Sequence, residues 1–197
     1  MTVTLTMCFY MSARLGEFTV CTQTSFNQHK HITTHNVTYK QDRNNFKVTV
    51  LHLPSTKVAS SEGEDMYWVT QDGDTNPTAA LQNHLLINQP PETMHLFAYQ
   101  IKNGHCPLTK SKFLERINDA VQAAGLKLLQ GHSIRIGSTL EYLLRGVPFN
   151  MMKAKGHWAG NSFLLYLRKH AIVIAPYIQV APTVQDAFIC YTMPPVH

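Results

Sequence analysis

The sequence predicts an α+β fold that is mainly helical and contains one small three-stranded antiparallel sheet. β-branched residues cluster within residues 32–70, and apolar residues recur at helical spacing on both sides of that region. Turn-forming residues separate the periodic segments. A length of 197 residues is typical of one domain, or of two small ones, and is enough to bury an apolar core without disulfides or a metal.

The first expected element is a helix over about residues 3–19. It is apolar on most sides, with Met7, Tyr10, Met11 and Leu15 at spacings of three and four. Such a helix is typical of a segment that the rest of the domain covers.

Three strands are expected next, at residues 32–40, 46–53 and 66–70. The turn formers at 41–45 join the first two strands into a β-hairpin, and the polar loop at 60–64 leads into the third strand. The three strands together predict a small antiparallel sheet.

Helices are expected over most of the remaining chain. Asn76 and Pro77 are typical of a helix start, and the Pro90-Pro91 pair ends that helix. Thr109 begins a helix with a clear apolar stripe, which ends at Gly125. Further helices are expected at residues 133–145, directly after Pro148, and from about residue 161 to 170.

Composition excludes several classes of protein. With 44% hydrophobic and 15% charged residues, the chain is not a disordered or acidic tail. The longest apolar run, residues 171–178, is too short to span a bilayer, and the N-terminus lacks the pattern of a secretory signal. The net charge of +5 suits a polyanionic partner, but it equally suits an ordinary basic domain. Four scattered cysteines, without paired spacing, indicate reduced thiols of an intracellular protein (Cys8, Cys21, Cys106 and Cys190).

His132 and Arg135 are three positions apart at the expected start of a helix. Residues at this spacing share a helix face, so an imidazole and a guanidinium can converge on one ligand. The free N–H groups and the dipole of a helix start favour an anion, and a phosphate is the obvious candidate. The alternative is a surface His and Arg that only solvate the helix start.

Tyr166 is the candidate nucleophile. It lies nine positions after His157 of the Gly156-His157-Trp158 segment, within the helix expected at 161–170. A phenol has a pKa of about 10, so its attack on an electrophile requires cations or a base nearby. The alternative is a core tyrosine with its hydroxyl at the edge of the core.

Two further cations are candidates for the same chemistry. Arg14 lies one helical turn before Glu17, and an Arg in an apolar helix is costly unless it is paired. Either Glu17 holds the guanidinium toward a cleft, or the two form a simple surface pair. Lys57 follows the second strand in a loop, where a solvated Lys is the alternative.

The order of these segments resembles the catalytic domain of tyrosine recombinases, the phage-integrase family of DNA breaking and rejoining enzymes. The resemblance extends from about residue 3 to 179 and is greatest to divergent members from fungal genomes and mobile elements. It depends on Arg-Leu-Gly-Glu at 14–17, Leu-Pro-Ser-Thr-Lys at 53–57, Gly-His-Ser-Ile-Arg-Ile-Gly at 131–137, Leu-Arg-Gly-Val-Pro at 144–148, Gly-His-Trp at 156–158 and Tyr-Leu-Arg-Lys-His at 166–170.

The resemblance implies a role for each catalytic candidate. Tyr166 would attack the scissile phosphate, form a 3′-phosphotyrosyl link and free a 5′-hydroxyl. Arg14 and Arg135 would bind the non-bridging oxygens. Lys57 would protonate the leaving 5′-oxygen, and His132 would accept or share the tyrosine proton.

Two supporting roles and the partners follow from the same resemblance. His157 would hydrogen-bond the phosphate with Trp158 packed behind it, and Glu17 would orient Arg14. The expected partners are double-stranded DNA and further copies of the chain, as a homo-oligomer that is a tetramer in the family. No cofactor, metal or membrane is expected, and the implied location is the nucleus.

The expected domain organisation is a catalytic domain over residues 1–179 and a C-terminal tail over 180–197. The helical core-binding domain that precedes the catalytic domain in the family is expected to be absent, because Arg14 comes so early. The tail would pack on a neighbouring copy or on its own surface.

Two other functions stay open from the residues. One is a catalytically inactive DNA-binding remnant of the same fold, which would bind duplex DNA through phosphate contacts. The other is a metal-dependent hydrolase that uses His29, His31 and His35, whose spacings could serve metal ligands.

Overall fold

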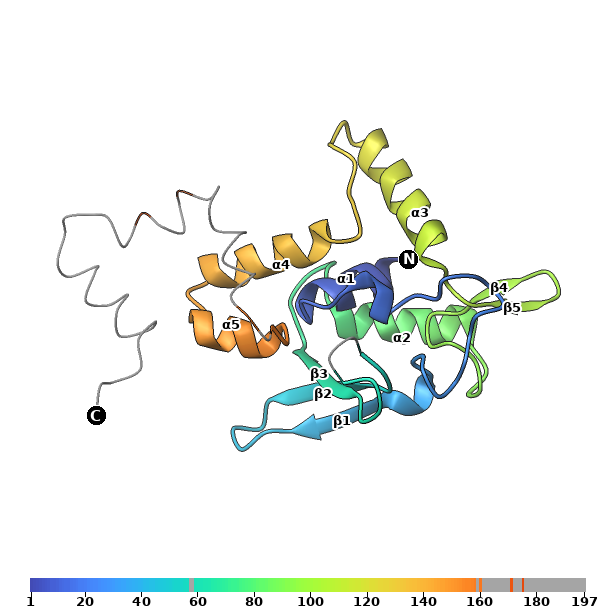
Figure 1. Ribbon diagram of the computed structural model, residues 1–197, viewed down its shortest axis with the longest axis horizontal. Helices are drawn as coiled ribbons and strands as arrows, with labels where there is room; N and C mark the ends of the chain where they lie inside the picture. Colours follow the sequence, from blue (N-terminus) through green and yellow to red (C-terminus); the bar gives the residue numbers. More distant parts are fainter. Residues whose placement is uncertain (57–58, 159, 161–170, 172–174, 176–197) are drawn as a thin grey trace. The chain divides into compact units, whose positions relative to one another are not determined.

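The computed structural model describes residues 1–56, 59–158, 160, 171 and 175 of the chain. It divides into two compact units, residues 1–134 (the first unit) and residues 135–197 (the second unit). The first unit contains helices α1 to α3 and both sheets, and the second contains α5 and most of α4 (Figure 1). The α+β class is therefore confirmed.

The first helix, α1 (Thr2–Tyr10), is shorter than the expected helix over 3–19. Ser12 has a left-handed φ of 54°, and the N–H of Ala13 donates to the carbonyl of Cys8, which closes the helix end. A separate 3₁₀ turn follows at Leu15–Glu17. The expectation that Arg14 lies inside a long helix is therefore wrong, since Arg14 has an extended backbone and begins this new turn.

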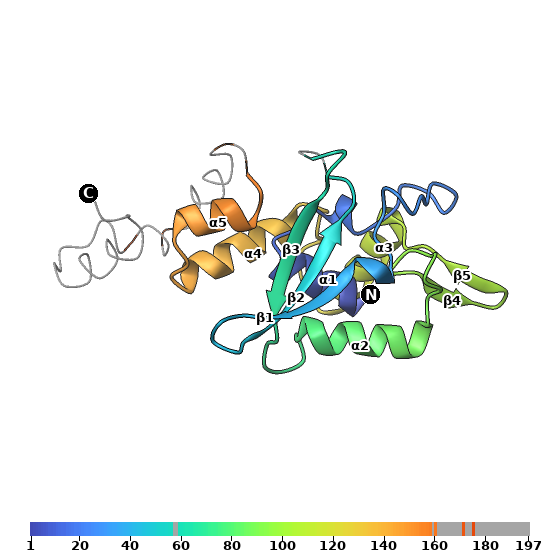
Figure 2. The same cartoon turned by 90° about the horizontal axis from the view of Figure 1, so that it is seen from below.

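The predicted three-stranded antiparallel sheet is formed, but its first strand begins at Val37 and not at residue 32, because Thr34–Asn36 form a 3₁₀ turn. Strands β1 (Val37–Gln41), β2 (Lys47–Leu53) and β3 (Glu64–Val69) pair antiparallel in the order β1-β2-β3, which Figure 2 shows from the sheet side. Val50 in the central strand lies opposite Thr38 on one side and Tyr67 on the other. The predicted hairpin is confirmed.

Helix α2 (Pro77–Asn88) begins where the sequence predicts. The Asn76 side-chain oxygen accepts hydrogen bonds from the N–H groups of Thr78 and Ala79, which satisfies two of the donors that a helix start leaves free. Helix α1 packs against α2, and the Trp68 indole donates to the Thr78 hydroxyl at 3.0 Å. These contacts join α1, the sheet and α2 into one core.

A short hairpin that the sequence did not predict follows α2. Strands β4 (Tyr99–Ile101) and β5 (Gly104–Cys106) form a separate two-stranded sheet. Helix α3 (Lys110–Ala123) then begins with the predicted cap, in which the Thr109 hydroxyl accepts from the N–H of Lys112 at 3.2 Å.

Helices α4 (Ser133–Leu144) and α5 (Phe149–Lys155) also lie within about one residue of their predicted bounds. Leu143 and Met152 are buried between them, and partly buried apolar neighbours surround that pair. The predicted helix at 161–170 and the tail at 180–197 lie outside the described residues. Among the helices that are described, none has the length and apolarity needed to cross a membrane.

Candidate functional site

A cavity of about 360 Å³ lies in the first unit, and we call it the Arg14 cleft. It brings together segments that are far apart in the sequence: the 3₁₀ turn after α1, the loop at residues 30–31 and the segment that follows β2. Arg14 and Lys30 supply positive charge, and two hydroxyl-bearing residues supply neutral polar groups. The complete lining is Arg14, Gly16, Glu17, Lys30, His31, Ser55 and Thr56.

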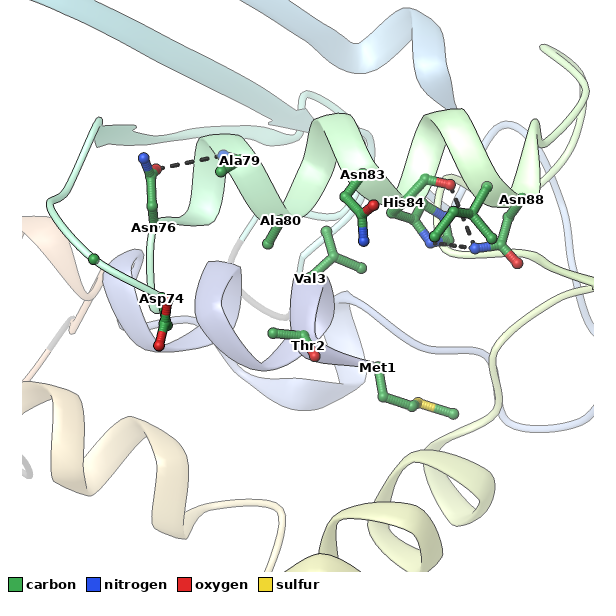
Figure 3. Close-up of a pocket in the computed structure, with 12 residues that line it drawn as sticks. Met1, Thr2, Val3, Asp74, Asn76, Ala79, Ala80, Asn83, His84 and Asn88 are labelled. Carbon is green, nitrogen blue, oxygen red and sulfur yellow. Dashed lines mark hydrogen bonds between the residues drawn. The ribbon is translucent and has the colours of Figure 1, made fainter.

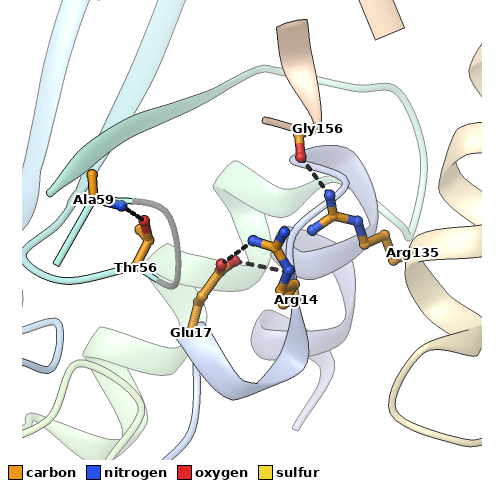
Figure 4. A network of polar contacts seen from close by, with 6 residues as sticks. All are labelled: Arg14, Glu17, Thr56, Ala59, Arg135 and Gly156. Atoms are coloured by element: carbon orange, nitrogen blue, oxygen red, sulfur yellow. Dashed lines mark hydrogen bonds and ion pairs between the residues drawn. The ribbon is translucent and has the colours of Figure 1, made fainter. Parts of the chain in front are cut away.

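The Arg14–Glu17 pair is the best defined interaction of the Arg14 cleft. Nη1 of Arg14 donates to Oε1 of Glu17 at 2.9 Å, and the backbone N–H of Arg14 donates to Oε2 at 2.9 Å (Figure 4). The Glu17 side chain is 9% exposed, whereas that of Arg14 is 31% exposed. Because a guanidinium has five N–H donors, Arg14 is held by its partner and keeps donors for a ligand.

Thr56 and Ala59 are joined by two hydrogen bonds. The N–H of Thr56 donates to the carbonyl of Ala59 at 3.0 Å, and the N–H of Ala59 donates to the Thr56 hydroxyl at 3.0 Å, the bond drawn in Figure 4. Thr56 lines the cleft and is buried. Lys57 itself lies outside the described residues, but it directly follows a residue of the cleft wall.

A second cluster of predicted site residues lies in the second unit. Arg135 is 1% exposed, its Nη2 donates to the carbonyl of Gly156, and its guanidinium carbon is 4.2 Å from the ring centroid of Trp158 (Figure 4 shows the Gly156 bond). A guanidinium stacked on an indole face is stabilised by the ring quadrupole. Arg135 is therefore not the solvated surface residue that the sequence left as an alternative.

The structure explains why glycine is required at position 156 of the Gly156-His157-Trp158 segment. A Cβ built on Gly156 would overlap the six-membered ring of Trp158, so only glycine fits beneath the indole. His157 has a left-handed φ of 51°, which turns the chain directly after α5. This turn places Trp158 against Arg135, while His157 itself is half-buried.

Two predicted site residues, His132 and Tyr166, are not found in either of these two clusters of described residues. His132 is exposed and directly precedes α4 in the first unit, whereas Arg135 belongs to the second unit. Tyr166 lies outside the described residues. The structure therefore brings together Arg14 and Glu17 with Ser55 and Thr56, and separately Arg135 with Gly156 and Trp158.

The alternative metal site is not formed. Within the described part of the chain, no three His, Cys, Asp or Glu side chains lie close enough to hold a metal ion together. Of its three proposed ligands, His31 bonds through Nδ1 to Asn27, and Nε2 of His35 lies 3.5 Å from a carboxylate oxygen of Glu92. The metal-dependent hydrolase hypothesis is therefore wrong for His29, His31 and His35.

A larger cavity, of about 490 Å³, lies beside α1 and α2 in the first unit (Figure 3). Its polar lining consists mainly of neutral side chains such as Asn83 and Asn88, and the Asn88 amide is bonded to Nδ1 of His84 at 3.1 Å. It has no Arg or Lys in its wall. Its wall also includes Asp74, whose carboxylate repels an anion, and Met1, whose α-amino group has its pKa lowered by burial. The smaller Arg14 cleft, with Arg14 and Lys30 in its wall, is therefore the better candidate for an anion.

Comparison of the chain with protein-family models, with curated proteins and with solved structures gives no match.

Two residues of the Arg14 cleft, Lys30 and His31, were not predicted to lie beside Arg14. They come from a loop without periodicity, so neither helix nor strand spacing could place them. The available signal was the short basic run His29-Lys30-His31.

Proposed function

We propose that this chain is a DNA strand-transfer domain of the tyrosine-recombinase type, which cleaves and rejoins double-stranded DNA through a phosphotyrosine at Tyr166. The observation that supports the proposal most is the composition of the Arg14 cleft. The resemblance assigns the segments 14–17 and 53–57 to one phosphate, and residues of both line this single cavity. Their fixed positive charge and hydroxyl groups suit a phosphodiester.

The proposed reaction exchanges one phosphoester for another. The Tyr166 oxygen attacks the phosphorus and passes its proton to His132, while the bond from phosphorus to the 5′-oxygen breaks. Lys57 gives a proton to the departing 5′-oxygen, which leaves as a hydroxyl. Rejoining is the reverse, with a 5′-hydroxyl attacking the phosphotyrosine. Because the ester bond is kept in the protein–DNA link, no nucleotide triphosphate is consumed.

The two arginines would stabilise charge on the non-bridging oxygens in the transition state. Preorganised donors are most effective when they need not reorient during the reaction. Arg14 is preorganised by both oxygens of Glu17, and Arg135 by Trp158 and the Gly156 carbonyl. His157 would add a hydrogen bond to the same phosphate. The proposal includes assembly of several copies on DNA and a nuclear location.

Covalent trapping on nicked DNA tests this proposal. The substrate is a library of duplexes of randomised sequence, each with a nick close to the cleavable position, so that a short strand diffuses away after cleavage and rejoining fails. We expect a protein–DNA band that survives denaturation and disappears in Tyr166→Phe. The matched control is Tyr39→Phe, which removes an exposed phenol hydroxyl from β1 and should leave the band unchanged.

Two results would count against the proposal. A band that persists in Tyr166→Phe would place the covalent link on another residue. Salt-sensitive DNA binding with no band at all would instead support the DNA-binding remnant.

A further inference from the structure

We propose that Lys30 and His31 form a second phosphate contact in the Arg14 cleft, so that the cleft binds two successive phosphates of one DNA strand. The inference rests on the proposed function, because it takes DNA as the ligand. The cleft, at about 360 Å³, is within the usual range of ligand pockets, roughly 300–1,000 Å³. It is therefore larger than one phosphate group held by a single guanidinium.

The loop that carries the two residues is held by its own hydrogen bonds. The N–H groups of Lys30 and His31 both donate to the carbonyl of Asn27, at 3.0 and 2.9 Å. The Asn27 side chain accepts from the N–H of His29 at 2.8 Å. The turn at residues 27–31 is thus ordered by local bonds, and it presents Lys30 and His31 together to the cleft.

Both backbone polar groups of Asn27 face the same nitrogen of the His31 ring. Nδ1 of His31 lies 3.0 Å from the backbone nitrogen of Asn27 and 3.1 Å from its carbonyl oxygen. Asn27 therefore occupies the Nδ1 side of the ring and leaves the Nε2 side to meet a ligand. Nε2 donates to a phosphate oxygen when it carries a hydrogen.

The other side of the His31 ring is packed against aromatic rings. Its centroid is 5.8 Å from that of Phe26 and 6.4 Å from that of His95. His95 is fully buried, and this burial, with smaller contributions from His31 and His84, lowers the pKa of His95 to about 3. His95 is neutral at physiological pH, so it supports His31 without competing with it for an anion.

The charge of the cleft also favours a polyanion. Its one carboxylate, Glu17, is paired with Arg14. Lys30 is exposed, and no acidic side chain in the described residues forms an ion pair with it. Arg14 and Lys30 therefore leave the cleft with a net positive charge, and polyanions are attracted to such a surface.

The salt dependence of DNA binding tests the role of Lys30. Anisotropy of a fluorescein-labelled duplex of randomised sequence is measured between about 50 and 200 mM salt, where each lost phosphate contact reduces the slope of log K against log salt by about 0.9. We expect Lys30→Ala to reduce the slope by about one such contact. The matched control is Lys102→Ala, an exposed Lys in the turn between β4 and β5, which should leave the slope unchanged.

His31 is tested by affinity at constant salt, because its proposed contribution is one hydrogen bond to a phosphate oxygen. We expect His31→Ala to weaken DNA binding about 10- to 150-fold at constant salt, the effect of one lost hydrogen bond to a charged group. His29→Ala, which removes an exposed neighbour outside the cleft, should have no effect.

These readouts separate the inference from the proposed function. A slope that falls in Lys30→Ala, in a chain that forms no covalent link with DNA, would support the phosphate contact and refute the strand-transfer activity. A chain that forms the covalent link, but in which Lys30→Ala and His31→Ala bind DNA as their controls do, would refute the inference. Circular dichroism of each variant verifies that it is folded.

Discussion

Two separate Gly→Ala substitutions in the second unit, at Gly156 and at Gly137, should change its free energy of unfolding in opposite directions. Gly156 lies directly beneath the Trp158 ring, and a Cβ there would overlap three ring carbons. Gly137 lies inside α4, and a Cβ there would meet nothing within 4 Å. The change from Gly to Ala is chemically identical at both positions, so only the surroundings differ.

The expected magnitudes follow from these surroundings. Gly156→Ala must displace the indole, and inserting atoms into a packed site costs about 1–3 kcal/mol. Displacement also weakens the stacking of Arg135 on Trp158, which contributes about 0.5–2 kcal/mol. We expect a total loss of about 2–3 kcal/mol. Gly137→Ala should instead stabilise the helix by about 0.5–1 kcal/mol, because alanine loses less backbone entropy on folding.

Urea unfolding followed by ¹⁹F NMR of 5-fluorotryptophan measures both effects. The chain has two tryptophans, and Trp68 and Trp158 report on the first and second units respectively. At an m-value of about 2 kcal/mol/M, Gly156→Ala should lower the midpoint of the Trp158 signal by about 1 M, and Gly137→Ala should raise it slightly. A Gly156→Ala midpoint equal to or above that of the wild type would refute the described packing of Trp158.

Three further predictions concern charged and titratable groups. Glu17→Gln removes the charge that holds Arg14, so we expect single-turnover formation of the covalent DNA complex to slow about 10- to 100-fold, and an unchanged rate would contradict the orienting role. Burial lowers the pKa of His95 from its usual 6.5 to about 3. At a pH between these two values, the unfolded chain binds a proton at His95 that the folded chain does not. The free energy of unfolding of the first unit, measured in urea, should therefore fall as the pH drops from about 7 to about 4. His95→Gln should reduce this dependence on pH. The same dependence in the wild type and in His95→Gln would contradict the prediction. Burial also lowers the pKa of Lys155 to about 8, so its charged form is disfavoured in the folded state. Lys155→Met should stabilise the second unit at neutral pH, and its advantage should shrink between about pH 8 and 10.5, whereas a constant difference would argue against a desolvated amine.

Local signals in the sequence were sufficient for most of the fold. Asn76 and Thr109 form the helix caps that their residue types predict, and the hairpin turn lies where polar residues interrupt two β-branched segments. The prediction of one helix over 3–19 is wrong because the apolar spacing continues past Tyr10, while the left-handed backbone at Ser12 ends the helix. Strands β4 and β5 have three residues each, too few to show a period.

The candidate site was predictable only where its contacts are local. The spacing of Arg14 and Glu17 predicts their ion pair, which the structure contains. The approach of Lys30 and His31 to Arg14 depends on the tertiary fold, so no spacing could reveal it. The need for glycine at 156 is likewise clear only once the Trp158 ring is seen above it.

DNA strand transfer through Tyr166 is best tested by identifying the residue to which DNA becomes attached. The denatured complex from the nicked duplex library is digested with trypsin and nuclease, and the modified peptide is sequenced by mass spectrometry. We expect a nucleotide attached through its 3′-phosphate to Tyr166, and no complex from Tyr166→Phe. A nucleotide on any other residue, or no covalent complex from the wild-type chain, would contradict this expectation.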